Sequence, residues 1–299
     1  MAEATSSQTT ADKPVRLWDT VQQDLDDRML EQSVPSGQLA ECFQAIEAYD
    51  RRFEPLDRTW KVIKIIAGVA TLFSLPIAFG TAGAGLVLTI PLAIFFVAAL
   101  ILHSKYAAGN LPDRRYRVPA EALKFLSVDM HPEAPVLMKI NFRPYQHKDY
   151  LTGKERDATD YQVTNYSYEQ PWLQLQGKLL DGSKFRLRVA TDVKRKQKQK
   201  RKRVKVTETF REKLDLTLTV SPEMYPGLER FPELLNQAPK PANLERLSAR
   251  AEGHQVVIDA LSRSLKSSLY SQADETTDHH TVLQLFLATY ECLRQCRTA

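Results

Sequence analysis

The chain has 299 residues, of which 26% are charged, and a formal net charge of +5. This length suffices for one or two soluble domains beside a membrane element. Residues 194–205 alone hold nine basic and no acidic side chains, and subtracting these nine charges from +5 leaves −4 for the rest. The composition therefore excludes a generally basic protein and concentrates the positive charge in one segment.

The first 59 residues predict a disordered tail followed by two helices. Residues 1–14 are rich in Ser, Thr and Ala and lack the apolar core and cleavage site of a secretory signal. In residues 15–59, apolar side chains recur at spacings of three and four, which predicts two amphipathic helices separated near Pro35. We expect their apolar stripes to pack on each other or on the following domain, with a partner protein as the alternative. The first stripe contains Trp18, Val21, Leu25 and Met29, and the second contains Leu39, Cys42, Phe43, Ile46 and Tyr49.

Residues 60–105 predict a transmembrane helical hairpin. Between Lys64 and Lys105 lie 40 residues without Lys, Arg, Asp or Glu. A single helix of that length would be about 60 Å long, about twice the thickness of the hydrocarbon core of a bilayer. Three glycines within residues 80–85 favour a tight turn, so we expect one membrane-spanning helix on either side of it. A re-entrant hairpin and a hairpin buried in a soluble core are the alternatives. The two expected helices cover residues 61–79 and 86–102.

The flanks of this hairpin predict how it lies in the membrane. Nine basic side chains flank it and its turn carries no charge, so the positive-inside bias predicts that both termini are cytoplasmic. A tryptophan lies where an interfacial aromatic anchor is expected, and lysines lie at both ends of the apolar segment. The sequence thus predicts an integral membrane protein, anchored at its flanks by Trp60, Lys61, Lys64 and Lys105.

Residues 118–225 predict a cytoplasmic β-rich domain. After a short helical pattern at 119–126, apolar and polar residues alternate in several segments. The sequence Asp181-Gly182-Ser183 is typical of a hairpin turn between two of them. About five antiparallel strands with short connections predict a β-sandwich or small barrel. The polar segment 146–160 is expected to be a mobile loop.

Residues 226–299 predict a proline-containing linker, a hairpin and a final helix. Alternating apolar residues favour a hairpin that turns at Gly253 and His254. Asp278 is expected to cap a helix from 281 to 295. Together the predicted elements make an α+β membrane protein, in which a two-helix transmembrane hairpin is joined to an antiparallel β-domain with helices at both ends.

The sequence contains no catalytic motif and no cofactor fingerprint, so we expect a protein without enzymatic activity, metal or cofactor. Cys292 and Cys296 are spaced as neighbours on a helix, but His279 and His280 lie one helix-length away, at least about 18 Å, which is too far to share a zinc ion. Cys42 occupies a core-facing helical position and has no identifiable base. An enzyme assembled from residues scattered along the chain stays open as an alternative.

The basic run 194–205 predicts the functional surface. It lies between strand patterns and is expected to form the tip and arms of a long β-hairpin, whose positive face Lys184, Arg186 and Arg188 extend. A solvated loop, a site for anionic lipid headgroups and a site for nucleic acid are its three interpretations. The absence of an aromatic residue from the run disfavours nucleic acid. The expected site consists of Lys194, Arg195, Lys196, Lys198, Lys200, Arg201, Lys202, Arg203 and Lys205.

These patterns lead to one hypothesis and two alternatives. The hypothesis is a membrane-anchored, non-enzymatic interaction module that engages anionic lipids, or an unidentified soluble protein, at the cytoplasmic leaflet of the bilayer. The first alternative is a membrane-tethered binder of nucleic acid or another polyanion. The second is a subunit of a pore or transport assembly, which the lack of ionisable residues inside the spans disfavours.

Overall fold

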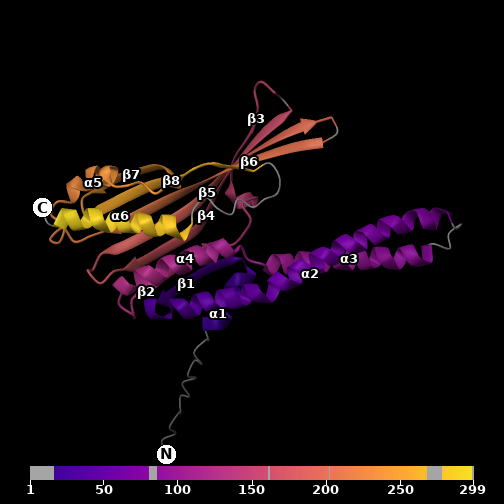
Figure 1. Ribbon diagram of the computed structural model, residues 1–299, viewed down its shortest axis with the longest axis horizontal. Coiled ribbons are helices and arrows are strands. Elements are labelled where there is room, and N and C mark those ends of the chain that lie inside the picture. The colour runs from indigo at the N-terminus through magenta and orange to yellow at the C-terminus, as the bar shows by residue number, and fades with distance from the viewer. Residues whose placement is uncertain (1–16, 81–85, 161, 202, 268–277, 298–299) are drawn as a thin grey trace, which may run out of the picture.

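The computed structural model describes residues 17–80, 86–160, 162–201, 203–267 and 278–297. They form a large antiparallel sheet, helices packed on one face of it, and a long helical hairpin that projects from this body (Figure 1). The helices are α1 (Leu17–Asp26), α2 (Leu39–Gly80), α3 (Leu86–Gly109), α4 (Asp113–Leu126), α5 (Phe231–Gln237) and α6 (His279–Arg297).

The sheet has nine strands, and every pairing in it is antiparallel. Seven strands follow the order β1-β2-β4-β5-β6-β8-β7, while β3 pairs with β4 and β9 pairs with β6. The strands are β1 (Met29–Pro35), β2 (Pro135–Asn141), β3 (Leu151–Arg156), β4 (Val163–Lys178), β5 (Lys184–Lys200), β6 (Arg203–Thr219), β7 (Leu244–Glu252), β8 (Gln255–Ser262) and β9 (Leu265–Ser267).

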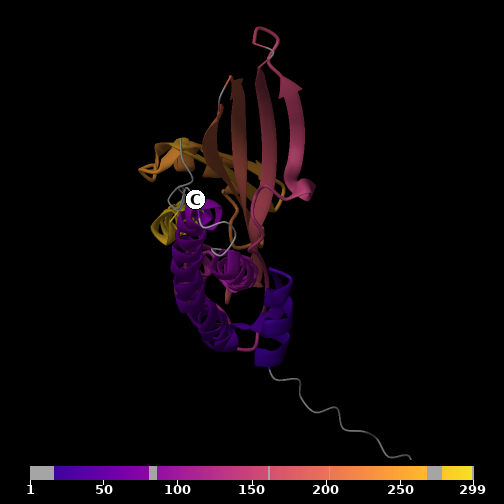
Figure 2. The same ribbon diagram turned by 90° about the vertical axis from the view of Figure 1, so that its right-hand side faces the viewer.

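The two faces of the sheet differ in character because successive side chains of a strand point to opposite sides. On the covered face, Leu187 and Leu216 are fully buried, and Phe185 makes an edge-to-face contact with Phe286 of α6 at 5.9 Å between ring centroids. On the open face, side chains such as Arg186 are exposed, and none of the described helices packs there (Figure 2). The hydrophobic core therefore lies between the sheet and its single layer of helices.

The expected sandwich or small barrel is wrong. The described strands form one open sheet, with β1 and β7 at the two ends of its path. A sandwich would need a second sheet to bury the apolar face, but α4 and α6 cover this face instead. The boundaries 118–225 stay a prediction, although the sheet also takes β1 from before this range and β7, β8 and β9 from after it.

The expected helix through Met29 is wrong at its end. Helix α1 ends at Asp26 and Met29 begins β1, which pairs with β2 in register. The change occurs at Arg28, whose φ of 55° reverses the chain and whose guanidinium donates to Ala107 O and Ala108 O of α3, both at 2.7 Å. The backbone carbonyls at the end of α3 have no partner within their own helix, and Arg28 supplies one. This contact favours a turn at Arg28 that the periodicity of the local sequence does not predict.

The segment 146–160, expected to be a mobile loop, contains the paired strand β3. The hairpin turns expected at Gly182 and Gly253 are present, and both glycines have positive φ. The expected cap of the last helix is also present, because Asp278 Oδ1 accepts hydrogen bonds from the backbone N–H and hydroxyl of Thr281. The predicted tail, residues 1–14, lies outside the described residues.

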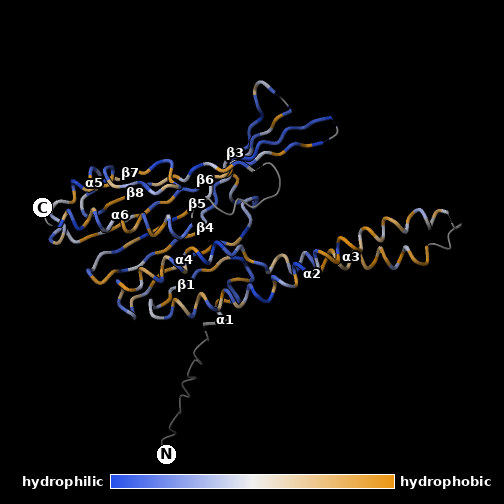
Figure 3. Tube along the Cα trace, viewed as in Figure 1, coloured by the Kyte–Doolittle hydropathy of each residue, from blue (hydrophilic) through white to orange (hydrophobic). Residues whose placement is uncertain are grey.

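The projecting hairpin consists of the second half of α2 and all of α3. Both helices are long and apolar enough to cross a membrane (Figure 3). Most of the described side chains in this part of them are exposed. The helices approach closely where the ring of Phe96 faces Gly68, and Ala67 and Ala99 are buried between them. The helix expected before the membrane and the first expected span are one continuous helix, α2, with Pro55 and Pro76 inside it. The predicted turn, residues 81–85, lies outside the described residues.

Candidate anionic-surface site on the β5–β6 arm

The basic run lies on a part of the sheet that extends beyond the helices, which we call the arm. It consists of β3 and the outer parts of β4, β5 and β6, residues 151–170 and 191–212. Strands β5 and β6 pair without a bulge from Lys184 and Thr219 out to Lys200 and Arg203. The run therefore forms the outer ends of both strands of one long hairpin, as the sequence predicts.

The register divides the cations of the run between the two faces of the arm. Lys198 lies opposite Lys205, and Lys200 lies opposite Arg203. Directly paired residues share a face, so these four cations lie together on the continuation of the open face. Two like-charged pairs at the end of a hairpin destabilise it, and only a nearby anion or the solvent offsets this repulsion. The same face carries Lys194 and Lys196, and further back along β5 it carries Lys184, Arg186 and Arg188.

Carboxylates of the arm neutralise three cations that lie before the tip. The Lys198 ammonium lies 2.6 Å from Asp160 and that of Lys196 lies 3.8 Å from Asp157. The hydrogen bond from Lys198 lowers the pKa of Asp160, so this carboxylate stays charged. On the other face, Arg195 lies 3.6 Å from Glu208. Three of the predicted site residues are therefore already paired within the protein.

The cations at the end of the hairpin are different. Their side chains are exposed, and they form no ion pair with any other residue that the structure describes. Lys202, expected at the tip itself, lies outside the described residues. The net positive charge of the arm is thus concentrated at and near its tip. The exposed set consists of Lys200, Arg201, Arg203 and Lys205. Lys194 is also exposed and forms no ion pair with a described residue, but it lies nearer the body.

An aromatic cluster supports the other face of the arm. The ring of Tyr145 packs edge-on against Tyr168 and Phe210, at 5.5 and 5.6 Å between centroids. Its hydroxyl donates to Glu208 at 2.5 Å, and burial together with this carboxylate raises the pKa of Tyr145. The sequence did not predict this cluster because Tyr145 lies in the loop after β2, whereas Tyr168 and Phe210 lie on β4 and β6. The alternation of Tyr166 and Tyr168 within a β-pattern was the one available signal.

The base of the arm is tied to the helix that follows the membrane hairpin. Arg114, at the start of α4, donates to the fully buried Glu212 of β6 at 2.5 Å, and its guanidinium lies 5.4 Å from the ring centroid of Trp172. The next residue, Arg115, donates to two backbone carbonyls and to Gln170 of β4, and burial lowers its pKa to about 10. An ion pair whose carboxylate is buried and hydrogen-bonded resists separation, so this pair joins α4 to the base of the arm.

The four predicted anchor residues lie where the hairpin leaves the body. Trp60 stacks on Tyr106 at 6.4 Å between centroids, and Lys64 Nζ lies 3.3 Å from His103 Nδ1. The other ring nitrogen of His103 lies 3.6 Å from Asp57. Lys61 and Lys105 are exposed. Polar and aromatic side chains of both helices thus form one collar below the uncharged part of the hairpin.

No cluster of three or more His, Cys, Asp or Glu side chains able to hold a metal occurs among the described residues. All three cysteines are buried and free, and burial raises the pKa of Cys42 to about 11. A thiol with this pKa is protonated at neutral pH and is a poor nucleophile.

Comparison with protein-family models, curated protein sequences and solved structures found no match for this chain.

Proposed function

We propose that this protein is a non-enzymatic module, anchored in a membrane by the α2–α3 hairpin, whose arm binds anionic lipid headgroups at the cytoplasmic surface. The length of the hairpin supports its role as the membrane anchor. From Trp60 to Gly80, α2 has 21 residues, or about 32 Å at 1.5 Å per residue. This length matches the hydrocarbon core of a bilayer, which is about 30 Å thick.

One observation carries the proposal for the arm. The arm and the helical hairpin leave the body toward the same side (Figure 1). A bilayer that contains the hairpin, with its near surface at the collar around Trp60, would therefore face the tip of the arm. The cations presented there are the exposed set, which has no carboxylate partner among the described residues.

The energetics fit such a contact. Each Lys or Arg near an anionic membrane surface contributes about 1 kcal/mol. The hairpin already holds the arm beside the bilayer, so little of this energy is lost to bringing the partners together. Binding to headgroups would also relieve the repulsion within the pair Lys200–Arg203, which no described carboxylate neutralises.

The experiment places a fluorophore at the tip of the full-length protein in liposomes. Gln199→Cys provides the only exposed thiol of the described chain, because the three natural cysteines are buried. We expect a quencher attached to lipid headgroups to reduce the fluorescence more as the anionic lipid content rises. The effect should weaken as salt is raised from about 0.05 to 0.5 M, because screening weakens this attraction.

Two triple variants provide a matched test. Lys200→Gln, Arg203→Gln and Lys205→Gln together remove exposed charges, and we expect them to abolish the dependence on anionic lipid. The control variant removes three charges that are already paired within the protein, by Arg195→Gln, Lys196→Gln and Lys198→Gln. It should keep most of the dependence on anionic lipid. Equal effects of the two variants, or quenching that is independent of lipid charge, would refute the proposal for the arm.

Nucleic acid is the second candidate because the arm brings aromatic rings beside cations. Lys154 Nζ lies 5.6 Å from the ring centroid of Tyr166, which stacks on Tyr168. Competition with single-stranded DNA separates the two functions. Release of the arm from anionic liposomes by micromolar DNA at physiological salt would favour nucleic acid.

A further inference from the structure

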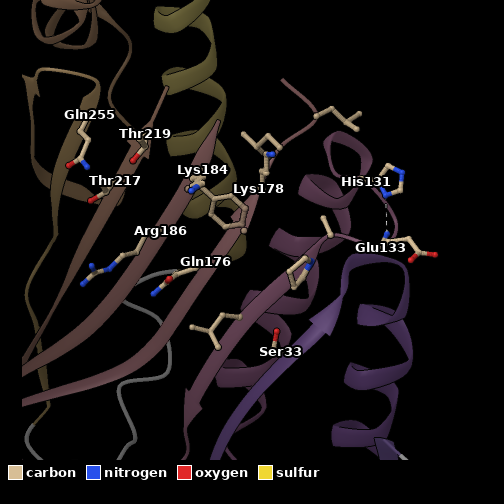
Figure 4. A pocket seen from close by; sticks show the side chains of 17 residues that line it. Ser33, His131, Glu133, Gln176, Lys178, Lys184, Arg186, Thr217, Thr219 and Gln255 are labelled. Carbon is tan, nitrogen blue, oxygen red and sulfur yellow. Dashed lines mark hydrogen bonds between the residues drawn. The ribbon is translucent and has the colours of Figure 1, made fainter. Parts of the chain in front are cut away.

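A second group of cations lies at the other end of β5, in a cavity on the open face of the sheet. The cavity has a volume of about 880 Å³ and is lined by residues of β1, β2, β4, β5, β6 and β8. Figure 4 shows Lys178, Lys184 and Arg186 together with the neutral polar side chains of Gln176, Thr217 and Thr219. Pockets of about 300–1,000 Å³ are typical of sites for small organic ligands.

The strand register brings these side chains together. Lys178 lies directly opposite Lys184, and Gln176 lies opposite Arg186. On the other side of β5, Lys184 lies opposite Thr219 and Arg186 lies opposite Thr217. Directly opposed residues have Cβ atoms about 5 Å apart. Three cations, two hydroxyl groups and one amide therefore point from three neighbouring strands toward the same space.

These cations are not neutralised by the protein. Lys178, Lys184 and Arg186 are exposed and form no ion pair within the described part of the chain. The one carboxylate in the lining, that of Glu133, lies with His131 at the opposite edge of the cavity from Arg186 (Figure 4). The pairing of Lys178 with Lys184 costs folding energy, as the like-charged pairs at the tip do.

The cavity is distinct from the surface that we assign to the membrane. Lys184 begins β5 and Lys200 ends it. Their separation along the strand is about 53 Å, at 3.3 Å per residue. A headgroup bound at the tip therefore cannot reach the cavity, which lies at the opposite end of β5.

We propose that this cavity binds a small soluble ligand that carries two or more phosphate groups. Arginine offers two parallel N–H donors to a phosphate, and lysine adds point charges around it. Three cations match the charge of a diphosphate or triphosphate. The hydroxyl groups of Thr217 and Thr219 and the amide of Gln176 can donate hydrogen bonds to phosphate oxygens or to the organic part. This inference does not depend on the function of the arm.

The test is isothermal titration calorimetry of the full-length protein in a neutral detergent, with ATP, inorganic pyrophosphate and uncharged adenosine as probes. We expect ATP and pyrophosphate to bind with dissociation constants below 0.1 mM, and adenosine not to bind. The double variant Lys184→Gln with Arg186→Gln should weaken binding at least tenfold. Arg186→Lys keeps the charge but loses the two parallel N–H donors of the guanidinium, and should weaken binding a few-fold.

Control variants keep this proposal separate from that for the arm. Lys200→Gln, Arg203→Gln and Lys205→Gln together should bind pyrophosphate as the natural chain does, and the cavity double variant should keep the response to anionic liposomes. A thermal unfolding midpoint that is not lowered would show that the exposed substitutions leave the fold intact, since each variant removes a like-charged pair. Failure of both phosphates to bind, or equal loss of binding in the tip and cavity variants, would overturn the proposal. Loss of the liposome response in the cavity variant would also overturn it, since the anion would then be a lipid.

Discussion

At the scale of single residues, Asp50 joins the base of the hairpin to the body. Its Oδ1 accepts the backbone N–H of Leu111 at 2.7 Å, and its Oδ2 accepts the hydroxyl of Tyr116 at 3.1 Å. Asp50 belongs to α2, Tyr116 belongs to α4, and Leu111 lies between α3 and α4. Burial raises the pKa of Asp50 to about 6, although the two hydrogen bonds act in the opposite direction.

The raised pKa of Asp50 makes the free energy of unfolding fall as the pH rises. A carboxyl whose pKa is about 6 in the folded state and about 3.9 in the unfolded state binds more protons when folded. Its stabilising contribution is fully present below about pH 3.9 and is lost as the pH rises through about 6. We therefore expect Asp50→Asn to gain thermal stability relative to the natural chain between pH 4.5 and 7. A difference in unfolding midpoint that stays constant over this range would contradict the assignment.

The sequence predicted the cations of the site but not how they are neutralised. The charge count identifies all nine basic residues of the run. It does not show that Asp157 and Asp160 lie beside Lys196 and Lys198, because that depends on how the connection between β3 and β4 folds back over β5. The division into paired and exposed cations therefore required the three-dimensional pairing of three strands.

At the scale of the elements, alternation along β5 decides which substitutions the sheet tolerates. Leu187 is fully buried on the covered face, whereas Arg188 points to the open face and lies 3.9 Å from Glu169. We expect Leu187→Asp to destabilise the fold by several kcal/mol, because it buries an unpaired charge. Arg188→Ser removes one exposed ion pair and should change stability by less than about 1 kcal/mol. Chemical unfolding of the full-length protein, followed by circular dichroism, measures both. Equal tolerance at the two positions would show that the register is wrong.

Elements with a strong local signal were predictable, and those fixed by distant contacts were not. Hairpin turns at Gly182 and Gly253 follow from residues that adopt positive φ, and the start of α6 follows from the cap at Asp278. Strand β1 depends on Arg28 capping α3, and β3 depends on a ladder with β4. Whether the sheet closes depends on which helices cover it, and alternation within single strands carries no such information.

At the scale of the whole molecule, the body carries an apolar hairpin and two separate groups of cations without an ion-pair partner among the described residues. The hairpin and the tip of the arm project to the same side (Figure 1), while the cavity lies at the opposite end of β5. The ion pair between Arg114 and the buried Glu212 connects α4, the helix after the hairpin, with the base of the arm. We expect this arrangement to fix the distance of the tip from the bilayer, so that the contact is set by the fold.

The most direct test of a membrane-spanning hairpin is whether its far end and the body lie on opposite sides of a membrane. Gly80 ends α2, and a side chain added there meets no atom within 4 Å, while Glu252 is exposed on β7. Gly80→Cys and Glu252→Cys are treated separately with a membrane-impermeant maleimide in sealed inside-out vesicles, whose outer surface is the cytoplasmic one. If the hairpin crosses the bilayer and the body is cytoplasmic, Glu252→Cys should react at once and Gly80→Cys only after permeabilisation. Reaction of both positions from the outer surface, or the reverse pattern, would contradict a hairpin that crosses the bilayer with the body in the cytoplasm.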